Sequence, residues 1–218
     1  MNKIIYILTL LLLAACHPKK QKQESSRVIH LPYYNDPYFT PKWLTPKSPE
    51  LKDFHKIGQF KLTNQLGEEI TNASFNNKIY ITNFFFTTCS GICPKMTEWM
   101  YTLQEKFKKD TDILLLSHSV TPNFDTPERL LAYAKNKNID SNKWHLVTGD
   151  RNLIYELGRK HYFAEEDLGV EKTNDEFLHT ENILLIDRKG HIRGIYNGIK
   201  KRSIKQLIVD IETLKKEH

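Results

Sequence analysis

Residues 78–97 read KIYITNFFFTTCSGICPKMT, and this stretch decides the fold. Its first nine residues form a nearly continuous apolar, β-rich run, which is typical of a strand buried on both faces of a sheet. Two cysteines, Cys89 and Cys93, follow directly and stand four positions apart. Pro94 then takes the favoured first position of a helix, and apolar residues recur at helical spacing as far as Phe107. The stretch therefore predicts a buried strand, a Cys loop and a helix in succession.

Strand and helix patterns alternate along the rest of the chain. A hairpin is predicted ahead of the quoted stretch, because residues 57–71 alternate around a turn at residues 64–67. After the quoted stretch, the predicted elements are a strand over 112–120, a helix over 125–136, a strand over 144–149, a helix over 152–161, a hairpin over 182–196 and a helix over 204–214. Asp125 is expected to cap the helix that it opens.

This order of elements predicts an α/β fold. Strands that alternate with helices favour a mostly parallel sheet with helices on both faces. The Cys pair at the end of the first buried strand, the closing hairpin and the last helix indicate a thioredoxin-like fold. The prediction is such a fold with an N-terminal β-hairpin extension and insertions.

Composition is that of one globular domain with an appendage. The 218 residues are 39% hydrophobic and 27% charged, which is enough apolar content for a real core. The net charge of +6 would suit a nucleic-acid partner, but the basic residues are scattered and no nucleic-acid-binding signature appears. We therefore expect no nucleic-acid partner.

The first 16 residues, MNKIIYILTLLLLAAC, predict export. Their apolar run is too short to span a bilayer permanently, so residues 1–15 are interpreted as a signal peptide. The ending LAAC resembles the lipobox of bacterial lipoproteins, which implies that Cys16 carries a lipid anchor. The alternative is an ordinary cleaved signal that happens to contain a cysteine. The prediction is a protein attached to the extracytoplasmic face of a bacterial membrane, where thiols are oxidised.

Residues 16–50 are predicted to link the anchor to a domain over residues 51–218. Residues 17–27 are polar and have no apolar face to bury, which is typical of a flexible leash. Residues 31–49 carry five prolines, which exclude regular structure, together with several aromatic residues. We expect this second part to lie extended against the domain.

Three segments resemble the Sco/SenC family of copper chaperones. Residues 86–94, FTTCSGICP, match the family motif F-x-x-C-x-x-x-C-P, and residues 119–134, SVTPNFDTPERLLAYA, also agree. The third segment is His179 with the sequence ILLIDRKGHIRGIYNG that follows it. The resemblance spans roughly residues 55–215. It implies a copper chaperone that delivers copper to the dinuclear CuA site in subunit II of cytochrome c oxidase, with a thioredoxin-like dithiol reductant as a second partner.

The chemistry of the candidate ligands agrees with copper. Soft thiolates select Cu(I), and a helix that begins at the cysteines would make thiolate available. The resemblance, and a position ahead of a strand that neighbours the Cys-bearing strand, make His179 the third ligand beside Cys89 and Cys93. This set suits Cu(I), or Cu(II) with one further ligand. The alternatives are a surface-loop histidine and a plain structural disulfide, whose small ring would remove little entropy from the unfolded chain.

Other candidates have simpler explanations. His118 could face the site, but a core histidine is the preferred interpretation. Met96 and Met100 follow the apolar stripe of their helix and are assigned to the core. Residues 164–177 are strongly acidic and form either a solvated loop or an arm that carries His179 to the metal.

Two alternative functions remain open at this stage. The chain could be a thiol-disulfide oxidoreductase that reduces the cysteines of the oxidase copper site, in which case His179 is dispensable. A peroxide-handling protein is less favoured, because it would need an arginine near the cysteines and none is close in sequence. The main hypothesis makes the chain a carrier of copper rather than an enzyme.

Overall fold

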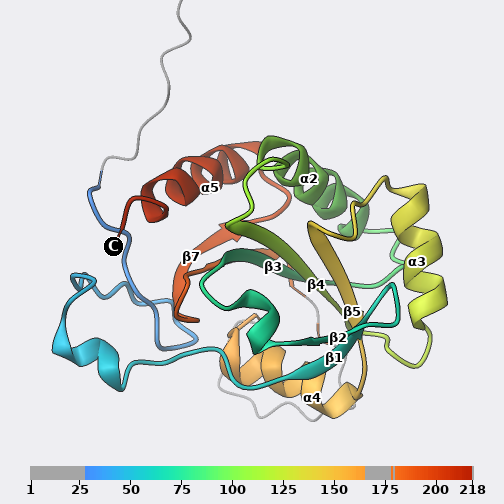
Figure 1. Ribbon diagram of the computed structural model, residues 1–218, viewed down its shortest axis with the longest axis horizontal. Helices are drawn as coiled ribbons and strands as arrows, with labels where there is room; N and C mark the ends of the chain where they lie inside the picture. Colours follow the sequence, from blue (N-terminus) through green and yellow to red (C-terminus); the bar gives the residue numbers. More distant parts are fainter. Residues whose placement is uncertain (1–27, 165–177, 179, 218) are drawn as a thin grey trace, which may run out of the picture.

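The computed structural model describes residues 28–164, 178 and 180–217 (Figure 1). The strands are β1 (Lys61–Asn64), β2 (Glu69–Thr71), β3 (Ile79–Phe85), β4 (Ile113–Ser119), β5 (Trp144–Thr148), β6 (Asn182–Ile186) and β7 (Ile192–Asn197). The α-helices are α2 (Cys93–Lys106), α3 (Pro127–Asn136), α4 (Arg151–Glu156) and α5 (Lys201–Leu214). Short helical turns lie at Pro49–Lys52 and Asn72–Phe75, and a π-helical turn, Leu157–His161, continues α4. The predicted α/β order of elements is confirmed.

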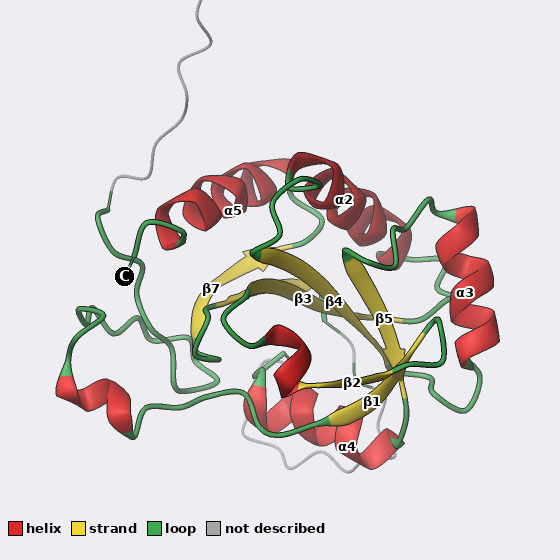
Figure 2. Ribbon diagram, in the orientation of Figure 1, coloured by secondary structure: helices red, strands yellow, loops and turns green. Residues whose placement is uncertain are grey.

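The seven strands form one sheet in the order β2-β1-β5-β4-β3-β6-β7 (Figure 2). Among the strands of the described residues, β3, β4 and β5 run parallel to one another. The remaining neighbour pairs are antiparallel. The prediction of a mostly parallel sheet is therefore wrong: the sheet is mixed. Each hairpin is antiparallel within itself, and each also joins the central strands antiparallel, β1 against β5 and β6 against β3.

Helices cover both faces of the sheet, as predicted. All seven residues of β3 are buried, because α2 and α5 lie over one face while α4 lies over the other (Figure 1). One core cluster takes apolar residues from α2, α3 and α5, and a second takes them from α4 and the hairpin β1–β2. The central strands are thus held rigidly from both sides, which fixes the position of the loops that leave their ends.

Two helix ends differ from the sequence-based prediction. Helix α2 begins at Cys93, one residue before Pro94, because the Ile92 carbonyl already accepts the N–H groups of Lys95 and Met96. The helix predicted over residues 152–161 ends as a π-turn, in which the Tyr162 N–H donates to the Leu157 carbonyl at 2.8 Å. Within the described part of the chain, no helix is long and apolar enough to cross a membrane.

Residues 28–50, which we call the strap, pack against the domain. Leu31 and Tyr33 are buried, and the backbone of Tyr33 exchanges two hydrogen bonds of 2.9 Å with Lys42. The Tyr34 N–H donates to the Ile192 carbonyl at the start of β7. The strap therefore lies against the domain, as the aromatic residues of this segment led us to expect.

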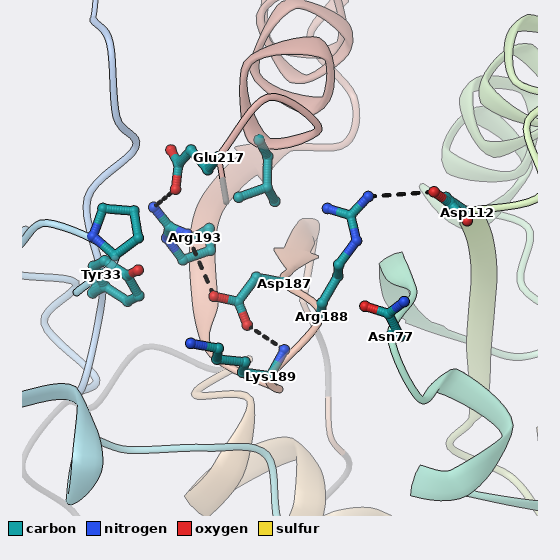
Figure 3. Close-up of a pocket in the computed structure, with 10 residues that line it drawn as sticks. Tyr33, Asn77, Asp112, Asp187, Arg188, Lys189, Arg193 and Glu217 are labelled. Atoms are coloured by element: carbon teal, nitrogen blue, oxygen red, sulfur yellow. Dashed lines mark hydrogen bonds and ion pairs between the residues drawn. The ribbon is translucent and has the colours of Figure 1, made fainter.

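Arg193 on β7 fixes the strap. Its guanidinium donates to the carbonyls of Leu31 and Pro32 and contacts the carboxylates of Glu217 and Asp187, at 2.6 and 3.4 Å respectively (Figure 3). It also lies 3.8 Å from the ring centroid of Tyr33. One buried cation thus ties the strap, the C-terminal end and the β6–β7 hairpin together.

The strap lies at the end of the sheet where the parallel strands begin. Tyr33 and Arg193 line a cavity of about 500 Å³ together with Asn77 and Asp112, which precede β3 and β4 (Figure 3). We call this the strap end. The Cys loop, residues 86–92, leaves the opposite end of β3, and a seven-residue strand spans about 20 Å. The two ends are therefore separated by the length of the sheet.

Candidate metal centre

The Cys loop connects the buried strand β3 to helix α2. Cys89 lies within the loop and is partly exposed, whereas Cys93 is the first residue of α2 and is buried. Both are free thiols, and they lie close enough for each to shift the pKa of the other. The strand and the helix therefore bring the two predicted sulfur ligands together.

No side chain caps the start of α2, and the sulfur of Cys89 lies close to it. Ile92, the N-cap residue, makes no side-chain hydrogen bond to the helix. Burial raises the pKa of the Cys89 thiol, but hydrogen bonds from the Cys93 thiol and from the backbone N–H groups of Cys93, Gly91 and Ile92 outweigh it and lower the pKa. Unpaired N–H groups at a helix start stabilise an anion, so Cys89 is the sulfur that ionises first.

Cys93 has the opposite character. Burial, the hydrogen bond with Cys89 and the negative charge of the Cys89 thiolate raise the pKa of the Cys93 thiol to about 12. Its side chain belongs to the core cluster of α2, and Cys89 packs against that cluster. One sulfur of the pair is thus accessible and ionisable, while the other is held protonated until a cation or a bond to sulfur replaces its proton.

Asp125 does not cap helix α3, which corrects the prediction. The cap is Thr126, whose hydroxyl accepts the Arg129 N–H. The carboxylate of Asp125 is fully buried and accepts hydrogen bonds from Thr87 at the start of the Cys loop. It turns inward because hydroxyl groups from β4 and the loop after it also converge there, from Ser119 and Thr121.

Arg129 contacts the start of the Cys loop, which sequence proximity did not reveal. Its Nε donates to the Thr87 hydroxyl at 3.1 Å, across 42 positions of the chain. Its guanidinium lies 3.8 Å from the ring centroid of Phe124, which is about half exposed. The absence of an arginine close in sequence therefore did not mean absence in space, although the spacing of Asp125 and Arg129 by one helical turn was a usable signal.

Two predicted site residues, His179 and Cys16, lie outside the described residues. Next to His179, the buried Leu178 lies close to Gly158 and belongs to the same core cluster as Phe84. In the antiparallel register of β3 and β6, Thr82 lies opposite Leu184, so the chain enters β6 at the end of β3 from which the Cys loop leaves. Among residues 28–164, 178 and 180–217, no group of three or more His, Cys, Asp or Glu side chains converges on a metal position.

The residues assigned to the core are found there. His118 is fully buried among aromatic rings, stacked at 4.9 Å on Phe84, and burial lowers its pKa to about 3. It is therefore a neutral core histidine. Met96 and Met100 are also fully buried, in the core cluster under α2.

Fold and site together define a class of protein: a thioredoxin-like domain that carries a Cys-x-x-x-Cys dithiol at the first turn of a helix. The chain belongs to the SCO1/SenC family, whose pattern matches residues 48–216. This covers the strands and helices from β1 to α5 and includes the Cys loop. The resemblance expected from the sequence is confirmed.

Three solved structures illustrate the similarity. A SCO1/SenC family lipoprotein from Bacillus anthracis is 28% identical, with a TM-score of 0.66 that covers 79% of this chain and 100% of that one. BsSco, a Sco family cytochrome c oxidase assembly protein in which a disulfide switch was identified, is 29% identical, with a TM-score of 0.63 over 73% and 93%. Copper-bound ScoI from Arabidopsis thaliana is 23% identical, with a TM-score of 0.55 over 72% and 94%, which supports the fold alone.

Proposed function

We propose that this protein is a membrane-attached copper chaperone that delivers copper to the CuA site in subunit II of cytochrome c oxidase. The observation that carries the proposal is the placement of Cys89 and Cys93 together at the start of α2, where each thiol shifts the pKa of the other. Two soft ligands at one point favour copper over harder metals. Similar proteins include BsSco, a cytochrome c oxidase assembly protein, and ScoI from Arabidopsis thaliana, whose structure contains copper.

Copper is the cargo, and the chain supplies its ligands. Cys89 and Cys93 each lose a proton when their sulfurs bind the ion, so binding releases protons to the solvent. The proposed third ligand is the imidazole of His179, since its neighbour Leu178 belongs to the core cluster that includes Phe84, near the end of β3. The set of two sulfurs and one nitrogen holds Cu(I), or Cu(II) with one further ligand.

The redox state of the dithiol controls this function. A disulfide between Cys89 and Cys93 forms when the pair loses two electrons and two protons, and it removes both sulfur ligands. A thioredoxin-like dithiol partner would restore them by exchange and would itself become a disulfide. The proposed location, a lipid on Cys16 at the extracytoplasmic face of a bacterial membrane, is supported by the family lipoprotein from Bacillus anthracis.

A second candidate function is thiol-disulfide exchange on the cysteines of the oxidase copper site. The contrast between the two thiols favours it, because hydrogen bonds lower the pKa of Cys89 whereas burial raises that of Cys93 to about 12. An accessible, ionisable sulfur beside a buried protonated one suits attack by the first and resolution by the second. In this function His179 has no role.

Copper counting separates the two candidates. The chain with Cys16→Ser, reduced and dialysed with Cu(I), should bind one copper per chain. We expect Cys89→Ser, Cys93→Ser and His179→Ala to abolish binding or weaken it at least tenfold. His145→Ala is the matched control, because this histidine lies on β5 beside Asn64 and is expected to leave binding unchanged.

The opposite result would favour the oxidoreductase. Full copper binding by His179→Ala would exclude the proposed third ligand. If wild type bound no copper but reduced a peptide disulfide that models the CuA cysteines at a rate lost in Cys89→Ser, the copper proposal would be wrong.

A further inference from the structure

We infer that Asp125 is a positioning residue for the Cys pair, acting through Thr87 to fix the distance between Cys89 and Cys93. The inference rests on the proposed copper function, because it concerns the geometry of the same two sulfurs. Neither residue belongs to the proposed ligand set. Their role follows from how the Cys loop is attached at its start.

Asp125 holds Thr87 by two hydrogen bonds. Carboxylate Oδ2 accepts the Thr87 backbone N–H at 3.2 Å, and Oδ1 accepts the Thr87 hydroxyl. The same hydroxyl accepts a hydrogen bond from Nε of Arg129 at 3.1 Å. Both the backbone and the side chain of Thr87 are therefore fixed, so this residue can neither rotate nor shift without breaking contacts. We call Asp125, Thr87 and Arg129 the clamp.

The far side of Asp125 is held equally firmly. Oδ2 also accepts the hydroxyls of Ser119 at 2.6 Å and Thr121 at 3.0 Å, so β4 and the loop after it secure the carboxylate. The side chain has no exposed surface, and Arg129 at 3.8 Å is the cation that faces it. A buried carboxylate needs such donors, and hydrogen bonds to an ionised group are about twice as strong as neutral ones.

The clamp fixes one end of the Cys loop and α2 fixes the other. Thr87 stands two residues before Cys89, whose N–H donates to the Phe86 carbonyl at 3.3 Å in a tight turn. Cys93 is already part of α2 and of the core. The separation of the sulfurs is thus set by two rigid attachments, and the clamp is the one made of side chains.

The test compares a substitution that keeps the shape of Thr87 with one that keeps its hydroxyl. Thr87→Val removes the hydroxyl and retains the volume, whereas Thr87→Ser retains the hydroxyl. Asp125→Asn weakens the acceptor itself. Its matched control is Asp187→Asn, because Asp187 is also a buried carboxylate that accepts several hydrogen bonds but lies at the strap end. Cu(I) affinity is measured in full-length protein by competition with a colorimetric chelator.

We expect Thr87→Val and Asp125→Asn to weaken Cu(I) binding about tenfold or more. Thr87→Ser and Asp187→Asn should remain within about twofold of wild type. A variant that is less stable but still folded should bind Cu(I) as tightly as wild type. Weaker binding by Thr87→Val and Asp125→Asn alone would therefore support positioning. Equal affinity of Thr87→Val and wild type, or an equal loss in Asp187→Asn, would overturn the inference. If Asp125→Asn fails to fold, the two Thr87 variants decide.

A metal-free measurement keeps this inference separate from the copper proposal. The Cys89–Cys93 pair is equilibrated with dithiothreitol, so that one disulfide gains two electrons and two protons while the other dithiol loses them. The clamp predicts at least a threefold change in this equilibrium constant for Thr87→Val and none for Thr87→Ser. If wild type binds no copper, the proposed function fails, yet this shift still supports the clamp and its absence refutes it.

Discussion

The two ends of the sheet each contain a buried carboxylate and an arginine, but they use them differently. At the strap end, the Arg193 side chain is 2% exposed and makes direct ion pairs with Asp187 and Glu217. At the Cys end, the Arg129 side chain is 43% exposed, and Asp125 takes its hydrogen bonds from Thr87 and other uncharged groups. The first arrangement fixes the strap to the domain, whereas the second holds the Cys loop in place beside the partly exposed thiol of Cys89.

The difference shows what each end is built for. A desolvated ion-pair network is costly to break, because loss of one member leaves other charges buried without partners. Hydrogen bonds from neutral hydroxyls to one carboxylate break singly and at lower cost. The strap end therefore contributes mainly to stability and the Cys end mainly to the geometry of the site, which the following substitutions test.

Arg193→Met should have the largest effect on stability. It leaves the carboxylates of Asp187 and Glu217 buried without their cation and removes the donors to the strap, so the free energy of unfolding should fall by about 3–5 kcal/mol. Urea denaturation measures the loss. Arg188→Met is the control, because this residue forms a more exposed pair with Asp112 and its loss should cost at most about 1 kcal/mol. Similar losses in both variants would contradict the role of Arg193 in fixing the strap.

Thr87→Val should cost less, about 2 kcal/mol. The substitution removes one hydroxyl donor from the buried carboxylate of Asp125 but leaves the backbone hydrogen bond of residue 87 in place. Thr88→Val, at the exposed neighbouring position, should change the free energy of unfolding by less than about 0.5 kcal/mol. Urea denaturation of the reduced proteins measures the free energy of unfolding of both variants. Equal values would show that the clamp does not contribute to the stability of the domain.

Arg129→Met should have a smaller effect than the same substitution at Arg193, about 1 kcal/mol or less. The guanidinium is partly solvated, so water replaces much of its interaction with Asp125 and Thr87, and the contact with the Phe124 ring is likewise half exposed. A loss as large as that of Arg193→Met would show that the two ends do not differ in kind.

The smallest expected effect is a change in the pH dependence of stability. Burial raises the pKa of Asp187, but the hydrogen bond and charge of His191 and the charge of Arg193 outweigh it and lower the pKa. The unfolded state therefore binds the Asp187 proton more tightly than the folded state does. The stabilisation by the ionised carboxylate is complete above about pH 4, near the pKa of Asp187 in the unfolded chain, and is lost as the pH falls through its pKa in the folded protein. Asp187→Asn should flatten the acid limb of the curve of unfolding free energy against pH, and an unchanged limb would exclude this origin.

Local patterns were sufficient for the elements and for the Cys pair. The run before Cys89 became the fully buried β3, and the apolar stripe after Cys93 became α2, because burial and helical spacing are properties of adjacent residues. Direction in the sheet was different. Nothing in the sequence of β1 or β6 indicates that these strands pair antiparallel to β5 and β3, so the predicted sheet had too many parallel pairs.

The surroundings of the site were beyond local patterns for the same reason. Asp125 resembles a cap in sequence, and the donors that turn it inward come from two segments, the Cys loop at Thr87 and the end of β4 with the loop after it, at Ser119 and Thr121. Arg129 reaches Thr87 only because β3 and β4 are neighbours. His179 remains a prediction from the resemblance, since it lies outside the described residues.

If Cys16 carries the proposed lipid, the docked strap limits how far the dithiol can travel from the membrane. With a lipid on Cys16, as proposed, 12 positions separate the bilayer surface from Val28, a reach of about 40 Å at most. Were the strap undocked, the tether would extend 41 positions to Ile57, and the effective concentration at a fixed recipient would fall about sixfold by the −3/2 power law. Because the Cys loop leaves the opposite end of β3, docking also places the sulfurs on the side of the domain away from the strap end and, with the proposed anchor, away from the bilayer.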